Sequence, residues 1–198
     1  MFLRHASPEE AVLKRMCDVI RHRGPDDEGF HVDGGSGIGM RRLSVIDLAT
    51  GHQPLANEDN SVWIVFNGEV YNFHELRDDL TSKGHRFRTA SDTEAIVHNW
   101  EQYGVEGLNR LRGMFAFCIW DSRKKQTVLV RDRFGKKPLY YSVDKDGLFF
   151  GSELKCLKAA GRPMDVDQEA LKLYFQWGYM PDPHTPYAGV FKLPPGGW

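Results

Sequence analysis

Asn67 and Gly68 are the two residues whose types and placement best suit chemistry. The apolar run 62–66 ahead of them has the composition of a buried strand, and a helix-type run follows Asn72. At the end of such a strand, an amide side chain and a glycine N–H can donate to one ligand oxygen, as an oxyanion hole requires. The alternative is a simple turn, because Asn-Gly is a strong turn signal in any protein. Taken alone, the pair favours the turn.

Arg42 and Asp92 lie in sequence surroundings that suit a ligand with one negative and one positive group. Arg42 stands beside apolar residues, and a guanidinium in such surroundings usually has a carboxylate partner from the protein or from a ligand. Asp92 follows Ser91 at the expected start of a helix, where it either stabilises the helix or meets a ligand ammonium. The sequence alone favours a structural ion pair for Arg42 and leaves both roles of Asp92 open.

The cysteines do not suggest a catalytic or metal site. Cys17, Cys118 and Cys156 are far apart and follow no C-x-x-C spacing, so neither a disulfide framework nor a zinc site is expected. All three lie in apolar patterns that predict burial and a protonated thiol. This usage fits a reducing cytoplasm.

Composition narrows the class of partner. The 198 residues have a formal net charge of −1, so there is no excess of positive charge that would attract nucleic acid or an anionic membrane surface. No apolar run approaches the about 20 residues that a transmembrane helix needs. The glycines at 34–37 lack the Lys-Ser/Thr of a phosphate-binding loop. Any partner must therefore be recognised by a specific site.

Periodicity and capping signals predict the elements that would position these residues. Helices are expected over 8–22, 73–84, 92–104, 105–111, 152–160 and 167–177. Strands are expected over 62–66 and in one antiparallel meander at 114–120, 127–130, 139–143 and 148–150. The nearly continuous apolar runs of these strands indicate two covered faces, as when two sheets stack between helices.

Six motifs stand in one order along the chain, and together they resemble the glutaminase domain of the asparagine synthetase family. They are Arg23-Gly24-Pro25-Asp26, Arg42-Leu43-Ser44-Val45, Asn67-Gly68-Glu69-Val70-Tyr71-Asn72, Ser91-Asp92-Thr93-Glu94, Gly113-Met114-Phe115-Ala116-Phe117 and the run from Arg131 to Tyr140. The resemblance covers about residue 12 to the end and implies a class II glutamine amidotransferase of the N-terminal-nucleophile hydrolase group. The implied fold is α+β, a four-layer αββα sandwich of two antiparallel sheets flanked by helices. The glutaminase domain would occupy 1–161, and 162–198 would be a helix and a proline-rich connector.

The resemblance also implies a reaction, hydrolysis of L-glutamine to glutamate and ammonia, and roles for four residues in it. Arg42 would hold the α-carboxylate of glutamine through its planar fork. Asp92 would receive the α-ammonium. The Asn67 side chain and the Gly68 N–H would form the oxyanion hole, where loss of one donor typically costs about 10²–10³ in rate.

The remaining implied roles are supporting ones. Glu69 would line the glutamine pocket, and Arg23 would support the loop of the nucleophile. The backbone of four consecutive residues would form the pocket floor: Leu43, Ser44, Val45 and Ile46. Ammonia would pass to a synthetase domain C-terminal to residue 198, which amidates aspartate or another carboxylate with ATP and magnesium. No Ser-Gly-Gly-x-Asp-Ser loop occurs here, so no cofactor and no metal are expected within these residues.

The beginning of the chain departs from the family. Family members place a cysteine after the initiator methionine, and its free amine activates the thiol. Position 2 here is Phe2. The first strand is therefore expected to be missing, leaving a gap or an unpaired edge that favours a homodimer. The chain alone is expected to bind glutamine without hydrolysing it; the alternative is a non-catalytic glutamine-binding or docking module.

Overall fold

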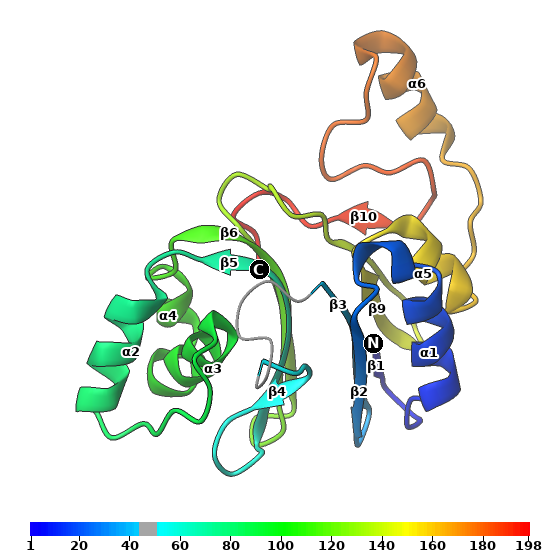
Figure 1. Cartoon of the computed structure of the whole chain (residues 1–198). Coiled ribbons are helices and arrows are strands. Elements are labelled where there is room, and N and C mark those ends of the chain that lie inside the picture. The colour runs from blue at the N-terminus through cyan, green and yellow to red at the C-terminus, as the bar shows by residue number, and fades with distance from the viewer. Residues whose placement is uncertain (44–50) are drawn as a thin grey trace.

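Two antiparallel sheets stack face to face in the computed structural model, which describes residues 1–43 and 51–198 (Figure 1). The larger sheet has the order β10-β8-β9-β1-β3-β2: β1 (Phe2–Leu3), β2 (Asp27–Asp33), β3 (Ser36–Arg42), β8 (Tyr140–Val143), β9 (Gly147–Gly151) and β10 (Phe191–Lys192). The smaller sheet has the order β4-β5-β6-β7: β4 (Leu55–Ala56), β5 (Val62–Val70), β6 (Gly113–Asp121) and β7 (Gln126–Arg131).

Helices cover the outer side of each sheet (Figure 1). The smaller sheet is covered by α2 (Phe73–Ser82), α3 (Asp92–Tyr103) and α4 (Val105–Leu108), and the larger by α1 (Glu10–Asp18) and α5 (Leu154–Ala159). A 3₁₀ turn, η1 (Arg21–Arg23), follows α1, and α6 (Gln168–Trp177) extends away from both layers. The expected four-layer αββα arrangement is confirmed. Among the described residues, no helix combines the length and the apolar character needed to cross a bilayer.

The alternation of side chains along β5 divides the core in two. Ile64 and Phe66 pack with Trp100 of α3 in the cluster between the smaller sheet and its helices. Val65 packs with Ile38 in the cluster between the two sheets. Since strand side chains alternate, Asn67 and Glu69 continue the row of Val65 on the inter-sheet side. One end of the interface between the two sheets is therefore lined by polar side chains.

The first strand was expected to be missing, and this expectation is wrong. Phe2 pairs with both Ser36 of β3 and Leu148 of β9, so β1 lies between them. The amine of Met1 donates to the carbonyl oxygen of Gly37 at 2.5 Å. A very short apolar segment suffices because it satisfies backbone groups on two neighbouring strands at once. The argument for a homodimer from an empty slot loses its basis.

The strands between 114 and 150 were expected to form one meander, and they divide between the sheets instead. Strands β6 and β7 belong to the smaller sheet, and β8 and β9 to the larger. The carboxylate of Asp132 fixes the crossing by accepting from the backbone N–H groups of Phe115, Phe134, Lys136 and Lys137, at 3.0–3.2 Å. Burial raises the pKa of Asp132, but these four donors outweigh burial and the net pKa is lowered.

The proline-rich tail, expected to be an extended connector, returns to the sheets. Strand β10 pairs with β8, and the N–H of Leu193 donates to the carbonyl oxygen of Leu139 at 2.9 Å. The N–H of Gly196 donates to the carbonyl oxygen of Asp132 at 2.8 Å. These contacts make the end of the tail part of the sandwich.

Candidate functional site

A cavity of about 350 Å³ lies where β3, the end of β5 and the start of α3 meet. Its lining includes every candidate residue that the structure describes: Arg23, Arg42, Leu43, Asn67, Gly68, Glu69 and Asp92. Ser44, Val45 and Ile46 lie outside the described residues. The lining also includes residues for which no role was predicted, among them Gln53, Ser91, Thr93, Met114 and Lys137.

Asn67 carries the clearest sign that the cavity receives a ligand. Its Nδ2 is buried, and among the described residues it has no hydrogen-bond partner. A buried donor without a partner costs about 1–3 kcal/mol, which a ligand oxygen at this position would offset. The amide is therefore placed to donate into the cavity.

Gly68 brings the backbone of β5 unusually close to β6. Its φ of 150° lies where side chains are rarely found. A Cβ here would meet the carbonyl oxygen of Met114 at 2.1 Å and the Cα of Phe115 at 2.6 Å. Only glycine fits without moving one strand away from the other.

The neighbouring arginines Arg41 and Arg42 face opposite sides of β3. Arg41 turns outward: its Nε donates to the carbonyl oxygen of Gly24 at 3.0 Å, and its Nη1 pairs with Glu28. Arg42 follows the row of Met40, which packs between the sheets. Arg42 is only 8% exposed and is one of the residues that line the cavity. Both arginines line the cavity, and the printed contacts of Arg41 give it a structural role as well.

The loop after η1 braces the part of β3 that carries Arg42. A Cβ on Gly24 would lie 2.3 Å from the carbonyl carbon of Arg41, so this contact requires glycine. The N–H of Asp26 donates to the carbonyl oxygen of Arg42 at 3.1 Å. Arg23 lies 3.5 Å from Glu153, which links the loop to the start of α5.

The carboxylates of Asp92 and Glu69 bring negative charge to the cavity lining. The hydroxyl of Ser91 caps α3 by accepting from the N–H of Thr93 at 3.0 Å, which leaves Asp92 in the first turn. The carboxylate of Asp92 accepts from the N–H of Val70 at 2.9 Å. Burial raises the pKa of Asp92, and the negative charge of Glu69 raises it further, against the effect of the backbone donors. A cation in the cavity would relieve this unfavourable charge.

Gln53 and Lys137 are lining residues that sequence reasoning missed. The Oε1 of Gln53 accepts from the N–H of Phe66 at 2.7 Å, and its Nε2 lies 3.5 Å from the hydroxyl of Thr93. Gln53 thus links β5 to α3 from a loop without any periodic pattern. Lys137 lies in the motif from Arg131 to Tyr140, but nothing else in the sequence indicated that it would line the cavity.

The three cysteines are buried and unpaired, as predicted. Burial raises the pKa of Cys17 and of Cys118 to about 12, and it also raises the pKa of Cys156. All three line a second cavity of about 90 Å³ that shares Asn67 with the first. Because the thiolate is the reactive form, none of them is poised as a nucleophile at neutral pH.

Taken together, the cavity lining gathers three arginines, two carboxylates and an amide donor that has no hydrogen-bond partner among the described residues. A guanidinium binds a carboxylate, and carboxylates bind an ammonium. An amide N–H at a site of developing negative charge stabilises an oxyanion. The arrangement suits an amino acid whose side chain bears a reactive carbonyl.

Comparison with known proteins points to the same chemistry. Residues 2–198 match the family model described as glutamine amidotransferase domain. Asparagine synthetase [glutamine-hydrolyzing] 1 of Bacillus subtilis is 44% identical over 194 residues, which are 98% of this chain and 31% of that protein. A putative asparagine synthetase [glutamine-hydrolyzing] of Mycobacterium tuberculosis is 42% identical over 209 residues, covering 96% of this chain and 32% of that protein. The chain thus spans about a third of the length of these relatives.

A solved structure shares the fold. Glutamine phosphoribosylpyrophosphate amidotransferase from Bacillus subtilis, complexed with ADP and GMP, matches with a TM-score of 0.54 and 27% identity. The match covers 69% of this chain and 32% of that one. The family match extends over nearly every residue, and the chain belongs to the glutamine amidotransferase domain family.

Proposed function

We propose that the chain is the glutaminase part of an asparagine synthetase or a related amidotransferase, and that its cavity binds L-glutamine. In this proposal, the side-chain amide is hydrolysed to glutamate and ammonia, and a second domain uses the ammonia with ATP and magnesium. The buried, unpartnered amide of Asn67 carries the proposal, because it lies in one cavity with Arg42 and Asp92. The relatives named as glutamine-hydrolysing asparagine synthetases support it.

Each functional group of glutamine has a counterpart in the cavity. Arg42 binds the α-carboxylate, and Asp92 with Glu69 receives the α-ammonium, which removes the charge repulsion between these two acids. Asn67 Nδ2 and the Gly68 N–H hold the amide oxygen, where negative charge develops when the carbonyl is attacked. Arg23 and Leu43 complete the described lining of the pocket in this proposal.

The nucleophile is the remaining question, and the buried cysteines bear on it directly. Cys17, Cys118 and Cys156 have raised pKa values, so a polypeptide of these 198 residues binds glutamine but does not hydrolyse it. The same observation favours the second candidate function, a non-catalytic glutamine-binding or docking module. Which of the two holds depends on whether a terminal cysteine can be supplied to the cavity.

Ammonia release from L-glutamine tests this directly. The 198-residue polypeptide should release none above background, whereas a version in which Met-Cys-Gly is added directly ahead of β1 should release ammonia. If the extended version binds glutamine but stays inactive, the docking module is the correct function. Turnover by the 198-residue polypeptide that persists after Cys17→Ser, Cys118→Ser and Cys156→Ser would contradict the assignment of the nucleophile.

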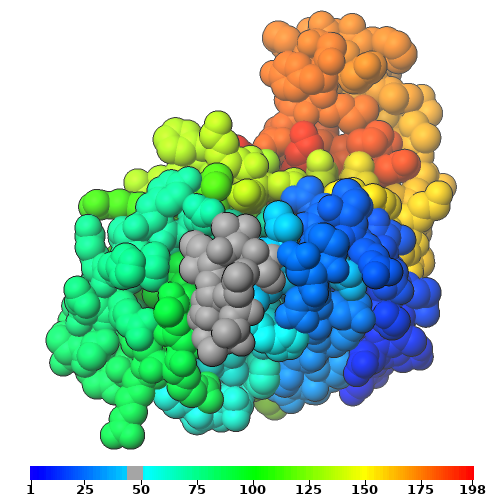
Figure 2. All heavy atoms as spheres, viewed as in Figure 1, coloured from blue at the N-terminus to red at the C-terminus, as the bar shows by residue number. Residues whose placement is uncertain are grey.

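The rest of the molecule suggests a partner domain and a compartment. Helix α6 stands away from the sandwich (Figure 2), and Phe175 and Trp177 on it are 81% and 59% exposed. In this proposal these aromatic side chains contact a synthetase domain, which accounts for the remaining two thirds of the relatives' length. Three unpaired thiols support a reducing compartment, the cytoplasm.

A further inference from the structure

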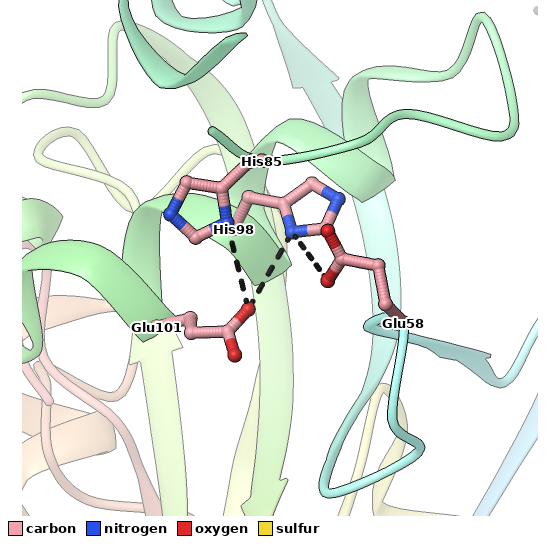
Figure 3. Close-up of side chains that lie close together, drawn as sticks. All are labelled: Glu58, His85, His98 and Glu101. Atoms are coloured by element: carbon pink, nitrogen blue, oxygen red, sulfur yellow. Dashed lines mark ion pairs between the residues drawn. The ribbon is translucent and has the colours of Figure 1, made fainter. Parts of the chain in front are cut away.

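Four side chains outside the glutamine cavity converge on one point, and we propose that they bind a zinc ion (Figure 3). They are Glu58, His85, His98 and Glu101, and their nearest ligand atoms all lie within 4.8 Å of one another. Glu58 lies in the connection from β4 to β5, His85 follows α2, and His98 and Glu101 are one turn apart on α3. The site would link three segments on the outer side of the smaller sheet.

The distances within the cluster fit coordination better than hydrogen bonding. His98 Nδ1 lies 3.6 Å from Glu58 Oε2 and 3.6 Å from Glu101 Oε2, and His85 Nδ1 lies 3.7 Å from the same Glu101 oxygen. N–H···O hydrogen bonds span about 2.7–3.2 Å. Zinc bonds of about 2.0–2.2 Å in a tetrahedron place neighbouring ligand atoms about 3.3–3.6 Å apart. These three distances are close to those around a tetrahedral zinc ion, and the ligand atoms, which lie within 4.8 Å of one another, would draw together when the ion binds.

Two of the atoms that face this centre, His98 Nδ1 and Glu101 Oε2, have no hydrogen-bond partner in the part of the chain that the structure describes. His98 is 0% exposed, yet neither of its ring nitrogens has a hydrogen-bond partner among the described residues. The Oε2 of Glu101 is also buried and without a hydrogen-bond partner in that part of the chain. Buried polar atoms of this kind are costly unless something satisfies them, and a cation between them would satisfy both.

The other oxygen of each carboxylate is held by the protein. Glu101 Oε1 accepts from Asn57 Nδ2 at 3.0 Å, and Glu58 Oε1 accepts from the N–H of Arg86 at 2.9 Å. In both residues Oε1 is thus occupied, while Oε2 faces the histidines. Hydrogen bonds to the distal oxygen are a common way to orient a carboxylate ligand of a metal.

The second nitrogen of each histidine also faces an oxygen. His85 Nε2 lies 3.0 Å from Gln102 Oε1, and His98 Nε2 lies 3.6 Å from Glu94 Oε1. A histidine ligand typically donates its other N–H to a carbonyl or carboxylate, which fixes the ring and its tautomer. The His85 contact fits this pattern, whereas 3.6 Å is too long for a hydrogen bond from His98 Nε2. In both rings Nδ1 faces a carboxylate oxygen of the cluster (Figure 3).

Two imidazoles and two carboxylates favour zinc among the common ions. Calcium and magnesium prefer all-oxygen ligand sets, and copper(I) prefers sulfur. Four protein ligands would close a tetrahedral shell, which is typical of structural rather than catalytic zinc. The ion would hold α3, whose first residue is Asp92, against the connections before β5 and after α2. The competing account is a buried network in which a proton on His98 takes the place of the ion.

Calorimetry with metal-free protein distinguishes the two accounts. Titration of the chelator-treated 198-residue chain with zinc chloride should show one saturable site per chain, and zinc should raise the melting temperature. His85→Gln and Glu58→Gln each remove one ligand and should weaken binding at least about 10–100-fold. His22→Gln is the matched control, since His22 pairs with Glu153 outside the cluster and should leave zinc affinity unchanged.

A second readout does not depend on the variants. Cobalt(II) bound to the wild-type chain should give the visible absorption of a tetrahedral complex, and zinc should displace it. Circular dichroism must show that the variants are folded, so that lost binding reports a lost ligand. The proposal is overturned if the wild-type chain shows no saturable zinc binding. Equal zinc affinity in wild type, His85→Gln and Glu58→Gln would overturn it as well.

Discussion

Among single residues, Asn67 has the most direct link to turnover. Its buried Nδ2 has no hydrogen-bond partner among the described residues, and in the proposed reaction it would interact with the charge that develops on the ligand. In the version with Met-Cys-Gly added directly ahead of β1, Asn67→Ala should lower kcat about 10²–10³-fold, with a much smaller change in KM. Steady-state kinetics of ammonia release provide the measurement. A change confined to KM would place Asn67 in ground-state binding instead.

Asp92 is expected to act in the ground state, and its environment makes glutamine binding depend on pH. Burial raises the pKa of Asp92, so glutamine affinity should fall as pH falls through a range above that of an ordinary aspartate. The sign follows because only the ionised carboxylate attracts the ammonium. Asp92→Asn should weaken binding about 10–100-fold at neutral pH, the loss expected for a hydrogen bond between charged groups.

Calorimetry at several pH values measures both effects. The variant should lose most of the acid-side dependence, and the exposed Asp18→Asn should behave as wild type. An unchanged pH profile in Asp92→Asn would contradict this account of Asp92.

The cavity residues that belong to a sequence motif could be predicted from the sequence. Asn67, Gly68 and Asp92 stand in motifs whose order identified the family, and the structure gathers them with Arg42. Gln53 was missed because its role depends on contacts with two distant elements. The Glu58, His85, His98 and Glu101 cluster was missed for the same reason, since three separate segments supply it.

At the scale of elements, the contact between β5 and β6 depends on Gly68. A Cβ would meet the carbonyl oxygen of Met114 at 2.1 Å, in a backbone conformation that side chains rarely adopt. Gly68→Ala should cost about 1–3 kcal/mol of unfolding free energy, measured by urea denaturation. Gly84→Ala is the control, because it also has positive φ but a Cβ there meets nothing within 4 Å. A smaller loss for Gly68→Ala than for Gly84→Ala would contradict the steric argument.

Capping and periodicity signals predicted where the helices lie, but they did not predict every contact at the helix ends. The cap at Ser91 is present as predicted. Asn72 precedes α2 as expected, but its side chain accepts from the N–H of Arg112 and donates to the carbonyl oxygen of Arg110 instead of capping. The division of the later strands between two sheets was not predictable, since it depends on how Asp132 holds the crossing.

At the scale of the whole molecule, the isolated chain is expected to self-associate through the exposed aromatic side chains of α6. Phe175→Ser with Trp177→Ser should reduce self-association, because these side chains are 81% and 59% exposed. Light scattering after gel filtration measures this. Glutamine affinity should stay unchanged, since α6 contributes nothing to the described cavity lining. Unaltered self-association in the double variant would show that another surface is responsible.

The layered sandwich was predictable because strand and helix patterns are strong and the motifs identify a family. The position of β1 was not, because a two-residue strand carries no periodicity of its own. Its place depends on the free backbone groups that β3 and β9 offer to Met1 and Phe2.

The central claim is that one cavity recognises the two charged ends of glutamine. Titration calorimetry of the 198-residue chain with L-glutamine tests it most directly, with D-glutamine and the Arg42→Gln variant as controls. One molecule of L-glutamine should bind per chain, D-glutamine should bind much more weakly, and Arg42→Gln should lower affinity at least about 10-fold through loss of the charged hydrogen bonds. No binding of L-glutamine, or equal binding by Arg42→Gln, would contradict the account.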